Sequence, residues 1–172
     1  MWVIMRRNVV VNRNLLEDIR DRYEVINKTL ALLPVFDLDI KSMIYETNRK
    51  IIFSRQTPLE IMEEACLEGG SSISGRIAFV REVVGIHRRR PVPVNVAEDI
   101  YAFPTFSHRN PNNCWIFYSH IRKGIADENT GEGIVIFFDG QQLPVHVSYP
   151  RLDKQILRTS RCKSICDHYR RY

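Results

Sequence analysis

Three consecutive arginines are the residues of this chain whose chemistry stands out first. They are Arg88, Arg89 and Arg90, and Pro91 follows them directly. A proline disfavours helix at the residue before it and holds the run extended. Arginines on an extended arm bind where the negative potential of DNA is deepest, in the narrow minor groove of A/T-rich sequence. The run therefore predicts a contact that reads the shape of A/T-rich DNA, and a solvated basic linker is the alternative.

A second set of basic residues lies near the end of the chain at helical spacing. We expect a helix over residues 150–172, because Pro150 suits a first helical turn and the apolar residues recur with helical periodicity. On such a helix four basic side chains fall within an arc of about 80°. They are Arg151, Lys154, Arg158 and Arg161. This stripe predicts contacts with phosphates, which set the affinity for DNA and its salt dependence but not its sequence preference.

A serine-lined helix start is the third candidate site. Residues 69–75 read GGSSISG, and Ser71 or Ser72 can cap a helix expected over residues 73–84. Free N–H groups at a helix start attract anions, so Ser71, Ser72 and the nearby Arg76 are also predicted to approach DNA. The stretch has no lysine and follows no buried apolar strand, which excludes a Walker-type phosphate loop.

No catalytic constellation is recognisable in the sequence. The histidines are scattered, and neither a nucleotide-binding glycine motif nor a metalloprotease motif occurs. Cys162 and Cys166 stand four residues apart with His168 close by, which makes a metal site conceivable, but no second ligand pair has a recognisable spacing. We therefore predict that the protein is not an enzyme and that it uses no cofactor and no metal.

The composition fits one soluble domain with a local excess of positive charge. The chain has 172 residues and a net charge of +5. Residues 151–172 hold seven Lys or Arg against two Asp, so this segment alone carries +5 and the remainder is close to neutral. Local basic patches favour an acidic polymer as partner. Without a signal peptide, a membrane-spanning run or paired cysteines, we expect a cytoplasmic, nucleoid-associated protein with no membrane partner.

Strand signals dominate the chain and predict an α+β fold, mainly an antiparallel sheet with two short inserted helices and a basic C-terminal helix. Residues 1–22 are a leader, either a short helix or poorly ordered; residues 23–149 form the DNA-binding core; residues 150–172 form the basic helix. Loops are expected over residues 107–113 and 124–133. Strands are expected over residues 23–34, 39–46, 50–55, 92–96, 100–103, 114–121, 134–138 and 141–147.

Capping and turn residues give the sharpest local predictions. Thr57 is an N-cap, Pro58 takes the first helical position, and Glu60 completes a capping box for a short helix. The polar triplet at residues 47–49 and the dipeptide Asp139-Gly140 predict two hairpin turns.

The apolar face of the C-terminal helix changes along its length. Beyond Ser160, apolar residues such as Cys162 and Ile165 rotate onto the side that carries the basic stripe. We expect either a kink at Thr159 and Ser160 or a different packing partner beyond them, and a dimer contact is one explanation for the second face. Ser148 is predicted to cap this helix.

A series of short motifs spans most of the chain, from about residue 30 to residue 161. The motifs are Leu33-Pro34, Thr57-Pro58-Leu59, Gly70-Ser71-Ser72, Gly75-Arg76, Pro93, Phe103-Pro104-Thr105, Cys114-Trp115-Ile116, Gly140, Ser148-Tyr149 and Arg158-Thr159. In this order and spacing they resemble the ComK family, the competence transcription factors of Bacillus-type bacteria. The resemblance implies a transcriptional activator of competence genes that recognises A/T-rich boxes of double-stranded DNA through the minor groove, without a helix-turn-helix. It further implies a homodimer or a dimer of dimers on DNA, contact with RNA polymerase, and delivery to proteolysis by an adaptor.

Two alternative functions remain open from the sequence. The chain ends at Tyr172, where the family pattern continues, so one alternative is a regulatory relative that does not bind DNA and acts by heterodimerising with a full-length paralogue. The other is a binder of single-stranded nucleic acid that stacks bases on Tyr101, Phe103 and Phe106, although these aromatic residues are better explained as members of the core.

Overall fold

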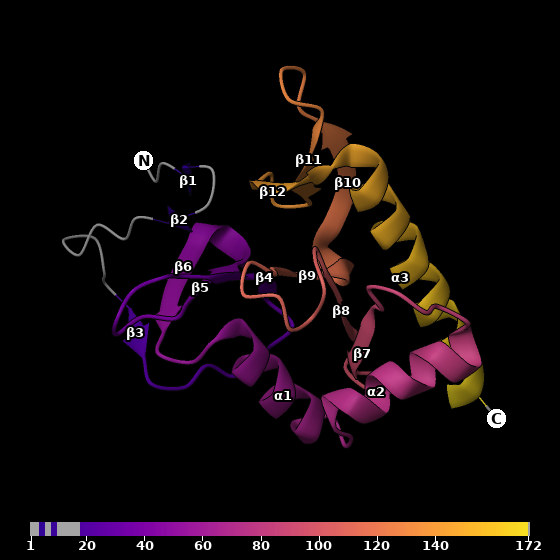
Figure 1. Cartoon of the computed structure of the whole chain (residues 1–172). Helices are drawn as coiled ribbons and strands as arrows, with labels where there is room; N and C mark the ends of the chain where they lie inside the picture. The colour runs from indigo at the N-terminus through magenta and orange to yellow at the C-terminus, as the bar shows by residue number, and fades with distance from the viewer. Residues whose placement is uncertain (1–3, 6–7, 10–17, 172) are drawn as a thin grey trace.

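Antiparallel strands dominate the structure, a computed structural model that describes residues 4–5, 8–9 and 18–171 (Figure 1). The largest sheet has seven strands in the spatial order β3-β6-β5-β4-β9-β8-β7. Its first pair, β3 and β6, is parallel, and the other neighbours are antiparallel. The strands are β3 (Ile19–Arg20), β4 (Thr29–Pro34), β5 (Ser42–Glu46), β6 (Lys50–Ser54), β7 (Val92–Asn95), β8 (Ile100–Pro104) and β9 (Trp115–Phe117).

A smaller sheet and the last helix cover one side of the large sheet. Strands β10 (Ile121–Ala126), β11 (Glu132–Phe137) and β12 (Gln142–Ser148) pair antiparallel in chain order. Helix α3 (Tyr149–Arg170) continues directly from β12, packs on this sheet and then runs on to β8 and β7 (Figure 1). A separate pair is formed by β1 (Ile4–Met5) and β2 (Asn8–Val9).

Two short helices are inserted between β6 and β7, as the sequence predicts. They are α1 (Pro58–Glu68) and α2 (Ile73–Phe79), and a π-helical turn (Val80–Val84) extends α2. The capping box is confirmed, since the Glu60 N–H donates to Thr57 Oγ1 at 3.2 Å and the Thr57 N–H donates to Glu60 Oε2 at 2.7 Å. Of the two candidate serines, Ser72 caps α2, because its Oγ accepts from the Gly75 N–H at 3.0 Å.

Both predicted hairpin turns are confirmed. A short 3₁₀ turn (Thr47–Arg49) joins β5 to β6 with Asn48 at φ 62°, and Gly140 in the turn between β11 and β12 has φ 86°. These left-handed angles suit asparagine and glycine. The proline-containing strand β7 is the last strand of its sheet, an edge position that accommodates Pro93.

The core is built on both faces of the large sheet. On one face Leu32, Ile52 and Trp115 pack with Ile61 and Met62 of α1. The other face packs on the small sheet and on the first part of α3. A third cluster lies at the end of α3 and joins Val80, Val84 and Tyr101 to Cys162 and Cys166. The α+β class with mostly antiparallel sheets is therefore confirmed.

The strand expected over residues 23–34 is shorter than predicted, because β4 begins only at Thr29. The residues before it are held by polar contacts in place of a ladder. The Tyr23 N–H donates to the Gln56 side chain at 2.8 Å, and the buried Tyr23 hydroxyl hydrogen-bonds Thr29 and Glu46, each at 2.7 Å. Tyr23 and Val25 are buried without extending the strand, whereas Ile26 is exposed.

The segment expected as one strand over 114–121 and a loop over 124–133 is arranged differently. Strand β9 stops at Phe117, a 3₁₀ turn (Tyr118–His120) redirects the chain, and β10 occupies part of the predicted loop. Gly124 fits in this strand because Leu152 of α3 lies against it, 3.2 Å from where a Cβ would stand.

The last helix runs without interruption through Thr159 and Ser160, so the kink is wrong and the alternative of a second packing partner is confirmed. Ser148 holds the N-cap position but makes no capping hydrogen bond with its side chain. Most of the expected leader, residues 1–3, 6–7 and 10–17, lies outside the described residues, and Ile19 belongs to β3. Among the described residues, no helix combines the length and the apolar character needed to cross a membrane.

Candidate nucleic-acid interface

The three consecutive arginines lie in residues 85–91, the arginine loop, which connects the π-helical turn to β7. The loop is fixed by hydrogen bonds to α3. Gln155 Nε2 donates to the Arg89 carbonyl at 2.9 Å, and Arg158 Nη1 donates to the Arg88 carbonyl at 3.3 Å. Arg90 Nε donates to the Ile86 carbonyl at 3.1 Å. Arg89 has φ 46°, so the predicted extended arm is wrong at this residue and the run is a folded loop.

The arginine loop and the stripe on α3 meet in space, although more than 60 positions separate them in the sequence. Burial, together with the charges of Arg151, Arg158 and Arg88, lowers the pKa of Arg89 from its ordinary value. Because like charges lower a pKa only when they are close, and because Arg158 donates to the Arg88 carbonyl, the two predicted basic elements form one surface. Figure 1 shows the chain after α2 passing beside α3 at this point.

We call the five guanidinium groups at this junction the basic cluster. Its members are Arg88, Arg89, Arg90, Arg151 and Arg158. None of the ion pairs among residues 18–171 includes any of these five arginines. A group of cations without carboxylate partners creates a positive potential that favours an anion.

A cavity of about 390 Å³ opens between the arginine loop and the loop that follows β8. Its lining residues are Ile77, His87, Arg88, Arg89, Arg90, Pro104, Ser107 and His108. The pKa of His108 is lowered by burial and by the charges of Arg109 and Arg90. Cationic and hydroxyl side chains on a concave surface can hold an oxyanion such as a phosphate.

The stripe on α3 divides into an inner and an outer part. Arg151 and Arg158 are half-buried beside the arginine loop, whereas Lys154 and Arg161 are exposed. Lys163, two residues beyond the stripe, is paired with Asp99 and, at 3.6 Å, with Asp167. Among residues 18–171, the four cations of the stripe therefore have no carboxylate partner, whereas Lys163 has two.

The serine-lined helix start is not part of this junction. The Ser72 hydroxyl already accepts the Gly75 N–H, and Arg76 donates from Nη2 to the Gly69 carbonyl. Ile77 of α2 lines the cavity at the arginine loop, whereas Ser71, Ser72 and Arg76 are not among its lining residues. The structure brings the two arginine sets together and directs Ser71, Ser72 and Arg76 to hydrogen bonds within α2 and the turn before it.

Sequence reasoning missed Gln155, the residue that ties the arginine loop to α3. A signal for it was present, because Gln155 stands on the buried face of α3 at helical spacing between Leu152 and Thr159. A polar residue on an apolar face must hydrogen-bond to a buried partner. It also missed His108, which lines the cavity from a loop far away in the sequence.

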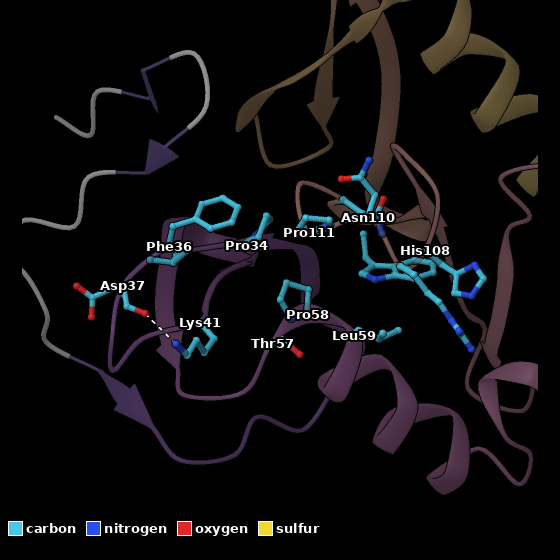
Figure 2. A pocket seen from close by; sticks show the side chains of 14 residues that line it. Pro34, Phe36, Asp37, Lys41, Thr57, Pro58, Leu59, His108, Asn110 and Pro111 are labelled. Atoms are coloured by element: carbon cyan, nitrogen blue, oxygen red, sulfur yellow. Dashed lines mark hydrogen bonds between the residues drawn. The ribbon is translucent and has the colours of Figure 1, made fainter.

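A second hollow of about 380 Å³ lies between α1 and the loops that follow β4 and β8 (Figure 2). Prolines and other apolar residues dominate its lining, including Pro34, Phe36, Pro58 and Pro111. The Lys41 Nζ donates to the Asp37 carbonyl at 2.9 Å, the contact drawn in Figure 2. No nucleophile with an adjacent base is found among its lining residues.

The aromatic and cysteine residues named in the alternatives are core residues. Tyr101 and Phe103 are each 1% exposed, so they offer no face on which a base could stack, and the single-strand alternative is wrong for them. Cys162 and Cys166 are buried against Tyr101 in the third cluster. Within the described part of the chain, no three His, Cys, Asp or Glu side chains are grouped to hold a metal ion.

Comparison with known proteins identifies relatives of the whole region. A family model described as "ComK protein" matches residues 20–170. The "Competence transcription factor" of Bacillus subtilis (strain 168) is 33% identical over 141 residues, which cover 81% of this chain and 72% of the relative. No solved structure matches the chain. The matched residues include the arginine loop and all of α3.

Proposed function

Since the chain belongs to the ComK family, we propose that it is a transcription regulator of competence that binds A/T-rich double-stranded DNA through the basic cluster. The observation that carries the proposal is the meeting of the arginine loop with the α3 stripe, without a carboxylate partner for any of the five arginines among residues 18–171. Holding like charges close together costs free energy, and binding of a polyanion offsets this repulsion.

We assign the two parts of this surface different roles. Arg88, Arg89 and Arg90 enter the minor groove and read its width, because narrow A/T-rich grooves have the deepest negative potential. The stripe, with Lys154 and Arg161 at its exposed side, binds phosphates and sets the register of the protein on the duplex. Ser71, Ser72 and Arg76 have partners within the protein, so the proposal does not depend on them.

Other features of the proposal rest on the family alone. They are activation of competence genes, binding as a dimer or a dimer of dimers, contact with RNA polymerase, and recognition by a proteolytic adaptor in the cytoplasm. A regulatory relative that does not bind DNA is the competing function, and the experiment below separates the two.

Fluorescence anisotropy on two labelled duplexes of equal length tests the proposal. One duplex carries paired A/T tracts and the other is G·C-rich, and each is titrated across a salt series. We expect the A/T duplex to be bound at least about tenfold more tightly, and a minor-groove ligand to compete with the protein. Equal, weak binding that vanishes at moderate salt would contradict the proposal and favour the regulator that does not bind DNA.

A further inference from the structure

Gln155 lies in the first half of α3 and is 2% exposed. Its Nε2 donates to two main-chain carbonyls from separate segments, Arg89 at 2.9 Å and Pro104 at 2.8 Å. Its Oε1 accepts from Arg158 Nη1 at 3.3 Å. One side chain therefore connects α3 to the arginine loop and to the end of β8.

These contacts use both N–H donors of the primary amide and one acceptor position of its oxygen. The two N–H groups meet the two carbonyls, and the oxygen meets the guanidinium. A buried carbonyl without a donor is costly, so an apolar side chain of the same size cannot replace this one without loss. Arg158 adds a second connection, because the same Nη1 also donates to the Arg88 carbonyl at 3.3 Å.

The conformation of the arginine loop needs such support. Arg89 has φ 46°, a left-handed angle that a residue with a side chain adopts at a cost. The loop also holds Arg89 close to other cations, which repel it. Because both the backbone angle and the charge repulsion disfavour this conformation, the loop keeps it only while hydrogen bonds from α3 hold its carbonyl groups.

We propose that Gln155 is a positioning residue that holds the arginine loop in the shape that presents Arg89 and Arg90 to DNA. The role in DNA binding rests on the proposed function, whereas the role in loop conformation does not. Gln155 touches no nucleic acid in this account and acts through the carbonyl of Arg89.

The variant Gln155→Met tests the DNA part, because methionine has a similar length and no N–H donor. We expect the preference for A/T over G·C duplex to fall at least about fivefold, with affinity for the G·C duplex and the salt slope little changed. Gln141→Met is the matched control. Gln141 Nε2 donates to the Glu46 carbonyl at 3.0 Å in a remote turn, and its replacement leaves the preference unchanged.

A double-variant cycle separates positioning from a general structural role. In the background of Arg89→Ala/Arg90→Ala, which keeps the main-chain carbonyls, Gln155→Met is expected to cause no further loss of A/T preference. Losses that multiply in full would overturn the proposal, because Gln155 would then act independently of Arg89 and Arg90.

Trypsin provides a test that needs no DNA, since it cleaves after Arg88 and Arg89 when the loop is free. We expect cleavage there to be about tenfold faster in Gln155→Met than in the wild type or in Gln141→Met. Unchanged cleavage would overturn the proposal even where the wild type prefers A/T duplex. Faster cleavage in a protein without A/T preference would uphold the loop role and reject the proposed function. If circular dichroism shows that Gln155→Met does not fold, Gln155→Asn is used in its place. Its amide is one methylene shorter and cannot reach both carbonyls.

Discussion

The two parts of α3 both carry basic residues but use them differently. In the first half, residues 149–161, the cations of the stripe have no carboxylate partner among the described residues 18–171. In the second half, Lys163 is paired with Asp99 and Asp167, and it also lies 5.4 Å from the centre of the Tyr101 ring. Positive charge in the first half is therefore available to a ligand, whereas that of Lys163 serves the fold.

The apolar contacts of the two halves differ as well. Leu152 packs the first half against the small sheet. The packing is so close that a Cβ on Gly133 would stand 2.7 Å from Leu152 Cδ2. Cys162 and Cys166 fasten the second half to Tyr101 and the π-helical turn. The difference teaches that a count of charges along a helix does not locate an interface, because ion pairing decides which charges remain free.

The largest effect is expected from the anchors of the two halves. Leu152→Ala removes a side chain that is 1% exposed and should lower the free energy of unfolding by about 2–5 kcal/mol. Cys162→Ala removes a single buried sulfur and should cost about 1 kcal/mol. Urea unfolding followed by circular dichroism measures both. Equal losses in the free energy of unfolding would contradict the expected difference, because the two halves would then be anchored with similar strength.

A smaller effect is expected from the cations. Arg161→Ala should lower the slope of log affinity against log salt by about 1 on either duplex, because one phosphate contact is lost. Lys163→Ala should change the slope by much less, since Lys163 is already paired with carboxylates. Anisotropy across a salt series compares the two variants. A larger change in the slope for Lys163→Ala than for Arg161→Ala would show that ion pairing does not decide which cations of α3 bind DNA.

Local features were predictable from the sequence because local residues determine them. The Thr57 capping box and the Asp139-Gly140 turn depend on a few neighbouring positions, and both are found. The basic stripe followed from helical periodicity alone. The break after Phe117 was missed because residues that favour strands, Tyr118 and Ile121, continue beyond it, while the chain turns into a second sheet.

Long-range features of the candidate site were beyond a reading of the sequence. The arginine loop was expected as an extended arm, but hydrogen bonds from Gln155 and Arg158 fold it against α3. These contacts join residues 66 and 70 positions apart, and no local pattern encodes them. Arg76 carries the same type of charge as Arg89, yet its Nη2 is directed to the Gly69 carbonyl and not to the basic cluster.

The central claim is that the arginine loop reads DNA while the stripe holds it, and two double variants test this claim most directly. Anisotropy would compare Arg89→Ala/Arg90→Ala with Lys154→Ala/Arg161→Ala on the A/T and G·C duplexes across a salt series, with thermal unfolding as the control for folding. We expect the first pair of substitutions to lower the A/T preference about tenfold. The second pair should weaken binding to both duplexes equally and lower the slope of log affinity against log salt by about 2. Equal effects of the two pairs on preference and on slope would contradict the claim.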